Sequence, residues 1–486
     1  MDDQSEYELV VGLEVHAQLL TQSKLFCGDS IAYGAEPNVQ VSPISLGHPG
    51  TLPKMNRKAI EFAVRMGLAC HSEIERENYF ARKNYFYPDL PKGYQVSQHT
   101  TPICRGGFIK IKTGEQGKII RLNRIHLEED AGKSLHDIDE QFSGIDYNRA
   151  GTALIEIVTE PDLRSSEEAF MYVSEIRKLV RYLGICDGNM EEGSLRCDAN
   201  ISVRKKGDMQ LGTKVEIKNL NSIRHIKKAI EVEAVRLIGL LEKGEVVRQQ
   251  TRSFDPAGGG GGTTFSIRDK EDAEDYRYFA EPDLTPFRLP EEFIEKIRSQ
   301  LPVLQEERVI KYKNEFGLSV YDAEVLTEEK SFSDYFNEAV KYSGHYKAVA
   351  NWMLGPVKSW LNEQNKEIDQ FPVPPAQLAK LASLVEEGRI SFTTAGARLL
   401  PQLLSDPDRD PEQVAIEHNL FLESDTMVLE ALVNQVLLKF AAKVNEYKKG
   451  KKGLLTLFVG EVMKLSKGKA DAGIVTELLL KKINAQ

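Results

Sequence analysis

The chain has no long hydrophobic segment. No uninterrupted apolar run among its 486 residues approaches about 20 residues, the length that a helix needs to cross a bilayer. Residues 1–6 are acidic and polar, without the basic and apolar segments of a signal peptide. These absences exclude a membrane-spanning protein and predict a cytoplasmic location.

Cysteine is scarce, and no Cys-x-x-Cys pair occurs. An odd number of scattered cysteines indicates reduced thiols and excludes the usual zinc spacing. Cys197 falls on the apolar side of a predicted strand, which favours core packing over catalysis. The glycine run at 258–262 is not followed by Gly-Lys-Ser/Thr, so it is not a Walker A loop.

Four segments alternate polar and apolar residues, the period of a β-strand. In residues 10–18, Val11, Leu13 and Val15 share one face, whereas Glu14 and His16 share the other. The other three segments carry these polar residues on one face: Glu156 and Glu160; Arg196, Asp198, Asn200 and Ser202; Lys214, Glu216 and Lys218. A fifth segment, residues 125–133, contains three acids beside His126.

Each strand by itself is also compatible with the solvated face of an antiparallel sheet. Taken together, five segments that carry acids toward one face need cations between them, because opposed like charges destabilise a sheet. Carboxylate oxygens with a histidine suit Mg²⁺, with Mn²⁺ as an alternative. Lys and Arg on the same faces suit phosphate. This combination is typical of phosphoryl transfer from ATP.

Residues 82–95 form a proline-interrupted segment that is rich in aromatic and basic residues. One interpretation is a hydrophobic loop that docks on the core. The other is a platform that stacks bases and contacts phosphate at a nucleotide or RNA end. The candidate residues for an RNA 3′ end are Arg82, Lys83, Tyr85 and Tyr87.

Residues 1 to about 290 combine predicted strands with helices at 59–68 and 165–183, and helical periodicity dominates after Pro290. Pro372–Pro375 is expected to be a linker. The net charge of −10 disfavours general nucleic-acid binding, so any such contact must be local. Residues 439–469 contain nine Lys against two Glu. The candidate phosphate contacts there are Lys448, Lys449, Lys451, Lys452, Lys467 and Lys469.

The sequence resembles the B subunits of the bacterial-type aspartyl/glutamyl-tRNA(Asn/Gln) amidotransferases over nearly its whole length. The matching motifs are at residues 12–16, 82–89, 127–133, 154–158, 191–200, 216–222 and 275–279. The glycine run at 258–262 departs from the usual loop of the family.

The resemblance implies an α+β cradle domain with a mixed or antiparallel sheet over residues 1–292. All-α regions follow, a helical domain at 293–405 and a tRNA-binding helical tail at 406–486. It implies that ATP phosphorylates the side-chain carboxylate of Glu-tRNA(Gln) or Asp-tRNA(Asn), and that ammonia then displaces the phosphate. A glutaminase partner, the A subunit, would supply the ammonia, and the small C subunit would complete a heterotrimer.

The family's catalytic metal site maps onto Glu14, His16, Glu129, Glu156, Asp198 and Glu216. Strand alternation supports all of them except Glu129, which a straight strand turns away from His126. Arg196, Lys214 and Lys218 are the candidates for nucleotide or acyl-phosphate contacts.

Two other functions remain open at this point. A tRNA-binding scaffold would use its acids only structurally, and a free-standing carboxylate-activating ligase would turn over a small metabolite without tRNA. The natural aminoacyl-tRNA, the number of metal ions and the ammonia path do not follow from the sequence.

Overall fold

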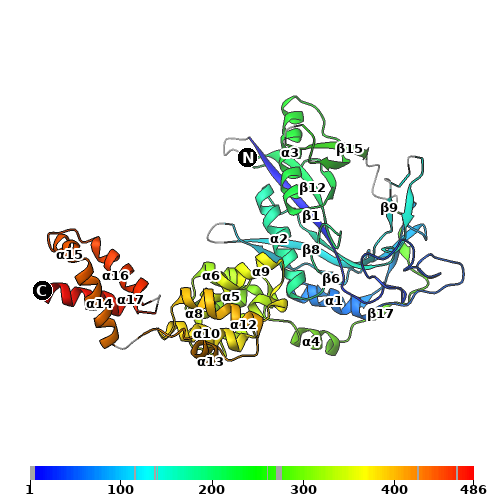
Figure 1. Cartoon of the computed structure of the whole chain (residues 1–486). Coiled ribbons are helices and arrows are strands. Elements are labelled where there is room, and N and C mark those ends of the chain that lie inside the picture. The colour runs from blue at the N-terminus through cyan, green and yellow to red at the C-terminus, as the bar shows by residue number, and fades with distance from the viewer. Residues whose placement is uncertain are drawn as a thin grey trace. The chain divides into compact units, whose positions relative to one another are not determined.

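The computed structural model describes residues 6–113, 117–135, 138–139, 141–259, 261–269, 276–423, 426–466 and 469–485. The chain divides into two compact units, one ending at Val303 and the other beginning at Leu304. Figure 1 shows that strands are concentrated in the first unit and that the second is helical. The first unit is therefore α+β and the second all-α, as the sequence predicted.

A 13-stranded sheet organises the first unit. Its central strands pair antiparallel, and β13 pairs parallel with β14. The main path runs β15 (Thr263–Asp269), β14 (Gln250–Asp255), β13 (Val215–Leu220), β12 (Leu195–Lys205), β1 (Tyr7–Gln18), β11 (Ala153–Thr159), β8 (Lys118–Glu129), β5 (Tyr94–Ser97), β4 (Ala81–Asn84) and β16 (Phe279–Ala280). Shorter strands complete this unit: β2 (Glu73–Ile74), β3 (Glu77–Asn78), β6 (Cys104–Arg105), β7 (Phe108–Ile111), β9 (Lys133–Leu135), β10 (Gly144–Asp146) and β17 (Phe287–Arg288).

Helices pack on the apolar face of this sheet because alternation places its hydrophobic side chains there. Val11, Val15 and Ala17 of β1 are fully buried. The covering helices are α1 (Arg57–Ala69), α2 (Ser166–Tyr182) and α3 (Ile223–Glu242), and α4 (Glu291–Ser299) contacts α1. The predictions for α1 and α2 are confirmed, with Ser165 as the N-cap of α2. The polar face of the sheet is left for the candidate site.

The second unit contains two hydrophobic clusters, one drawn from residues 312–420 and the other from residues 429–483. Its helices are α5 (Gln305–Asn314), α6 (Val320–Leu326), α7 (Lys330–Ala339), α8 (Tyr346–Trp352), η2 (Met353–Val357), α9 (Lys358–Gln364), η3 (Ile368–Gln370), α10 (Pro375–Glu386), α11 (Phe392–Thr394), η4 (Ala395–Leu399), α12 (Leu400–Ser405), α13 (Pro411–Glu417), α14 (Thr426–Lys439), α15 (Ala441–Lys448), α16 (Leu454–Leu465) and α17 (Ala472–Ala485).

The prediction of a linker at Pro372–Pro375 is wrong. Val373 is fully buried in the first of these clusters, and Pro375 begins α10 at a position where a missing N–H costs nothing. Among the helices of the described residues, none combines the length and apolar character that a membrane span requires.

Candidate active site

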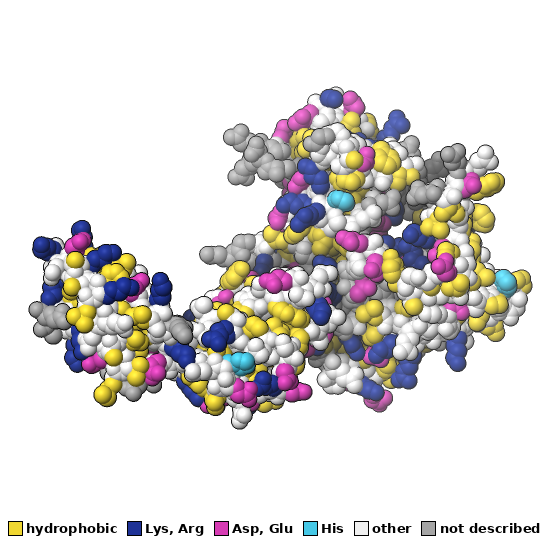
Figure 2. All heavy atoms as spheres, viewed as in Figure 1, with side chains coloured by type: hydrophobic (Ala, Val, Ile, Leu, Met, Phe, Trp, Pro, Cys, Tyr) yellow, Lys and Arg dark blue, Asp and Glu magenta, His cyan; other side chains and the backbone are white. Residues whose placement is uncertain are grey.

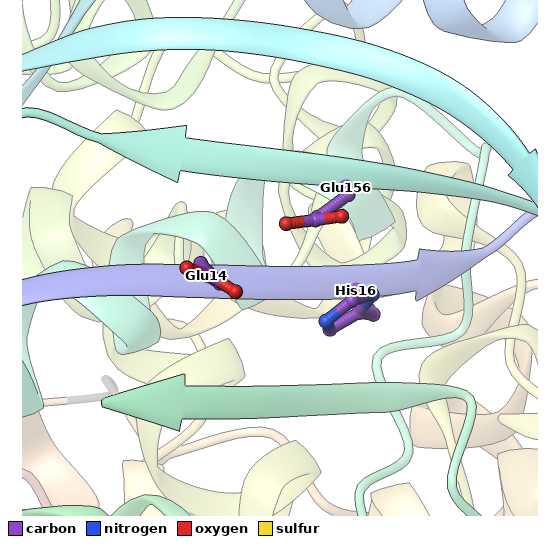
Figure 3. Close-up of side chains that lie close together, drawn as sticks. All are labelled: Glu14, His16 and Glu156. Carbon is purple, nitrogen blue, oxygen red and sulfur yellow. The ribbon is translucent and has the colours of Figure 1, made fainter. Parts of the chain in front are cut away.

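The polar face of the sheet carries a cluster of acids and histidines on five adjacent strands. In the register, Glu14 of β1 lies opposite Asp198 of β12, and His16 lies opposite Glu156 of β11. Figure 3 shows Glu14 and His16 on one strand and Glu156 on its neighbour. Glu216 of β13 extends the row on one side, and β8 extends it on the other. Strand order therefore gathers residues that are up to about two hundred positions apart in the chain.

Three overlapping groups in this cluster have a geometry that can hold metal ions, since their ligand atoms lie within 4.8 Å of one another. The groups are Glu14, His16 and Glu156; His126, Glu128 and Glu156; and Glu14, Asp198 and Glu216. Carboxylate oxygens with imidazole nitrogen suit Mg²⁺ or Mn²⁺. Because the second and third groups share no residue, the cluster has donors for more than one ion.

The electrostatics of the cluster indicate an excess of negative charge. Burial and repulsion from Glu156, Glu216 and Asp198 raise the pKa of Glu14. Burial alone would lower the pKa of His126, but the adjacent Glu156 and Glu128 raise it to about 9. A divalent cation would relieve this repulsion, so the residues present fit a metal.

Among the described residues, a lysine pairs with acids at one end of the cluster and histidines pair with acids at the other. The Nζ atom of Lys218 lies 2.8 Å from Asp198 and 3.2 Å from Glu216. At the other end, the Nε2 atom of His126 lies 3.1 Å from Glu156, and the Nδ1 atom of His16 lies 3.5 Å from Glu128. Glu14, at the centre, accepts a hydrogen bond from the amide of Asn200 at 2.9 Å. Within the described part of the chain, Glu14 forms no ion pair with a lysine or an arginine.

The structure places Glu128, rather than Glu129, in the cluster. Glu129 lies on the opposite face of β8, where it accepts hydrogen bonds from Lys92 and from the backbone N–H of Val96. It lines a separate cavity of about 200 Å³. The assignment of Glu129 to the metal set is corrected, because successive side chains of a strand point to opposite faces. The same alternation, applied to His126, identifies Glu128 from the sequence alone.

Of the three candidate phosphate contacts, two line the cavity of the cluster and one does not. Lys218 and Arg196 line the cavity that contains the cluster, which measures about 460 Å³, and the Nη2 atom of Arg196 lies 2.7 Å from Asp130. Lys214 precedes β13, is exposed and is not among the residues that line this cavity. Alternation could not predict this, because it does not show where a strand begins.

Residues 82–95 are not a continuous loop, since β4 overlaps their beginning and β5 overlaps their end. Lys83 and Tyr85 line the cavity. Arg82 points to the other face and forms an ion pair with Glu281, and Tyr87 is half exposed outside the cavity lining. Tyr276 and Tyr278, which are remote in sequence, line the cavity beside Tyr85, as does His99. Tyr276 and Tyr278 belong to the family motif at residues 275–279, but strand periodicity did not link these three rings to the site.

The basic residues of the C-terminal cluster are largely solvent-accessible. Lys448, Lys449, Lys451 and Lys452 are exposed around the end of α15, and Lys469 is half-buried. Figure 2 shows Lys and Arg side chains gathered over these C-terminal helices. Lys467 lies outside the described residues.

Comparisons with known proteins identify the family of the chain. A family model described as "GatB/GatE catalytic domain" matches residues 9–295, and one described as "GatB domain" matches residues 334–483. The first unit is therefore a catalytic domain of this class.

The chain belongs to the family formed by the B subunits of the aspartyl/glutamyl-tRNA(Asn/Gln) amidotransferases. It is 48% identical to the B subunit from Thermodesulfovibrio yellowstonii over 98% of this chain and 99% of that protein. It is also 48% identical to the Geobacter sulfurreducens protein of the same name, again over 98% of this chain and 99% of the relative. The resemblance stated from sequence motifs is confirmed.

Proposed function

We propose that this chain catalyses ATP-dependent transamidation of Glu-tRNA(Gln), Asp-tRNA(Asn) or both. The observation that carries the proposal is the set of overlapping carboxylate and imidazole groups in a cavity that also contains Lys218. The relatives' names specify the matching aminoacyl-tRNAs. A carboxylate is a poor electrophile, and transfer of the γ-phosphoryl group to it creates a leaving group. ADP departs first, and ammonia then replaces phosphate to form the amide.

The residues of the cavity have distinct roles in this proposal. Glu14, His16, Glu128, Glu156, Asp198 and Glu216 would hold Mg²⁺, or alternatively Mn²⁺. When bound, the metal would neutralise phosphate charge. Lys218 and Arg196 are cations that can orient the phosphates and the acyl phosphate. Preorganised charge of this kind is the main catalytic contribution in phosphoryl transfer.

The ammonia is proposed to come from glutamine hydrolysed on a separate glutaminase, the A subunit, and the small C subunit is proposed to complete a cytoplasmic heterotrimer. The relatives are each named as one subunit of an amidotransferase, which supports an assembly of several chains. The exposed lysines near α15 are proposed to contact the tRNA.

The test is amide formation on Glu-tRNA(Gln) with ATP, Mg²⁺ and ammonium chloride, using this chain assembled with its glutaminase and its small partner. Ammonium bypasses the glutaminase, so the assay isolates the contribution of this chain. We expect Glu14→Gln to lose at least about 100-fold in rate, since the change removes a central charged ligand, while tRNA binding persists. Glu191→Gln, the same change at an exposed loop position, is the matched control. Wild-type activity in Glu14→Gln would favour the scaffold function, and turnover of a free amino acid without tRNA would favour the small-metabolite ligase.

A further inference from the structure

Four aromatic rings form a continuous row along one side of the 460 Å³ cavity. The ring centroids of Tyr85 and Tyr276 lie 5.9 Å apart, and those of Tyr276 and Tyr278 lie 6.1 Å apart. His99 stacks on Tyr278 with a centroid distance of 4.0 Å and an interplanar angle of 9°. We call these four residues the aromatic row. All four line the cavity that contains the acidic cluster.

Three adjacent segments at one edge of the sheet build the aromatic row. Tyr85 follows β4, His99 follows β5, and Tyr276 and Tyr278 precede β16, and these strands are neighbours in the order β5–β4–β16. The side-chain amide of Asn84 donates to the carbonyl oxygen of Arg277 at 2.8 Å, which ties two of the segments together. The rings therefore converge because of tertiary structure, not because of their spacing in the sequence.

The aromatic row is not a packed core. Its three tyrosines are only half-buried and His99 is exposed, although aromatic rings that serve packing alone are usually buried. Rings that remain accessible inside a polar cavity present flat apolar surface to a ligand. A planar base is the ligand class that such surface suits.

Lys83 connects the aromatic row to the acidic cluster. Its Nζ atom lies 4.9 Å from the ring centroid of Tyr276 and 5.6 Å from that of Tyr85. Lys83 lines the same cavity as Glu128, and its ammonium interacts electrostatically with that carboxylate. A cation held beside both features is suited to a phosphate attached to a stacked base.

We propose that the aromatic row stacks the adenine of an adenosine group and that Lys83 contacts the phosphate of the same group. The inference rests on the proposed function, in which adenosine has two sources, ATP and the 3′-terminal nucleotide of the tRNA. The cavity volume lies within the usual range for sites that bind small molecules.

The experiment measures binding of two probes to the full-length chain in Mg²⁺. One probe is ADP, and the other is an RNA hairpin ending in CCA, compared with the same hairpin lacking its terminal A. Tyr276→Leu removes a central ring, and Tyr276→Phe keeps it. The matched control is Phe86→Ala, because Phe86 belongs to the same segment as Tyr85 but is 89% exposed and does not line the cavity.

We expect Tyr276→Leu to weaken the binding of one probe by roughly 10-fold to 100-fold, the usual effect of losing one stacked base. Tyr276→Phe and Phe86→Ala should bind both probes with nearly wild-type affinity. Weaker ADP binding assigns the aromatic row to ATP. Loss of the preference for the terminal A assigns it to the RNA end. If both probes bind Tyr276→Leu and Lys83→Met as they bind wild type, the inference is overturned. Loss of amide formation in Glu14→Gln would still support the proposed function in that case.

Discussion

Glu128 and Glu129 are adjacent in the chain but belong to different sites. Glu128 joins the acidic cluster and accepts a hydrogen bond from Ser97 at 3.2 Å, whereas Glu129 pairs with Lys92 on the opposite face. Burial would raise the pKa of Glu128, but hydrogen bonds from His126 and His16 hold that pKa well below its usual range. Glu128 is therefore ionised and available to a cation at neutral pH.

This difference between neighbouring residues can be tested directly. We expect Glu128→Gln to weaken Mg²⁺ binding at least about tenfold, because it removes a charged ligand, and Glu129→Gln to leave the affinity unchanged. Calorimetric titration of the full chain with Mg²⁺, or electron paramagnetic resonance with Mn²⁺, measures both. Equal effects of the two variants would contradict the corrected ligand set.

At the scale of elements, one ion pair holds together segments that are far apart in the chain. Arg82 of β4 forms two hydrogen bonds with Glu281, which follows β16, at 2.7 and 2.8 Å. The side chain of Glu281 is 1% exposed. Burial alone would raise the pKa of Glu281, but the hydrogen bonds from Arg82 lower it overall. The pair therefore stabilises the edge of the sheet that carries the aromatic row.

The pH dependence of this contribution has a definite sign. Because the folded-state pKa of Glu281 is depressed, the stabilisation is present above its unfolded value near 4.5 and is lost as pH falls through the folded value. Arg82→Met leaves a buried carboxylate without its main partner, so we expect a loss of about 3 kcal/mol in unfolding free energy at pH 7. The loss in unfolding free energy should become smaller toward pH 4, because protonation of Glu281 removes its buried charge.

Urea unfolding followed by circular dichroism at both pH values checks this expectation. Arg121→Met is the control, because the side chain of Arg121 is 68% exposed where it pairs with Asp162 and should contribute little. A loss that grows as pH falls would refute the assigned role of the ion pair.

Helix α3 shows why some helices are not predicted from the sequence. Its buried positions include Ile226, Ile230 and Leu237, at helical spacing. Glu233 interrupts this apolar stripe, yet it is fully buried and pairs with Arg236. A buried ion pair inside a packed face resembles a break in amphipathic periodicity, so α3 is not among the helices predicted from the sequence.

At the scale of the whole molecule, charge is unevenly distributed. The chain carries a net charge of −10, yet exposed lysines gather near the end of α15. Lys451 already pairs with Glu446 at 2.9 Å, whereas Lys448 and Lys449 are exposed on the helix end. These two lysines are therefore the preferred positions for a test of phosphate contact.

We expect Lys448→Ala combined with Lys449→Ala to weaken tRNA binding and to reduce the slope of log affinity against log salt by about 1 to 2. The slope falls because binding releases fewer counterions when two phosphate contacts are lost. Filter binding at several salt concentrations measures the slope. The pair Lys311→Ala and Lys313→Ala removes the same charge from exposed positions on α5 and serves as the control. An unchanged slope in the α15 variant would exclude these lysines as phosphate contacts.

The sequence by itself determined which side chains share a strand face. Glu14 with His16, and Glu216 with Lys218, follow from the two-residue period of an extended backbone, which is a local property. The change from an α+β unit to a helical unit was also predictable, because strand and helix periods differ.

Only the tertiary structure decided that β13, β12, β1, β11 and β8 are neighbours, and that three remote segments bring Tyr85, His99 and Tyr276 to one wall. Strand order and register depend on contacts between residues far apart in the chain, and no local period encodes them. The faces of the site were therefore determined locally, and its assembly into one cavity was determined by long-range packing.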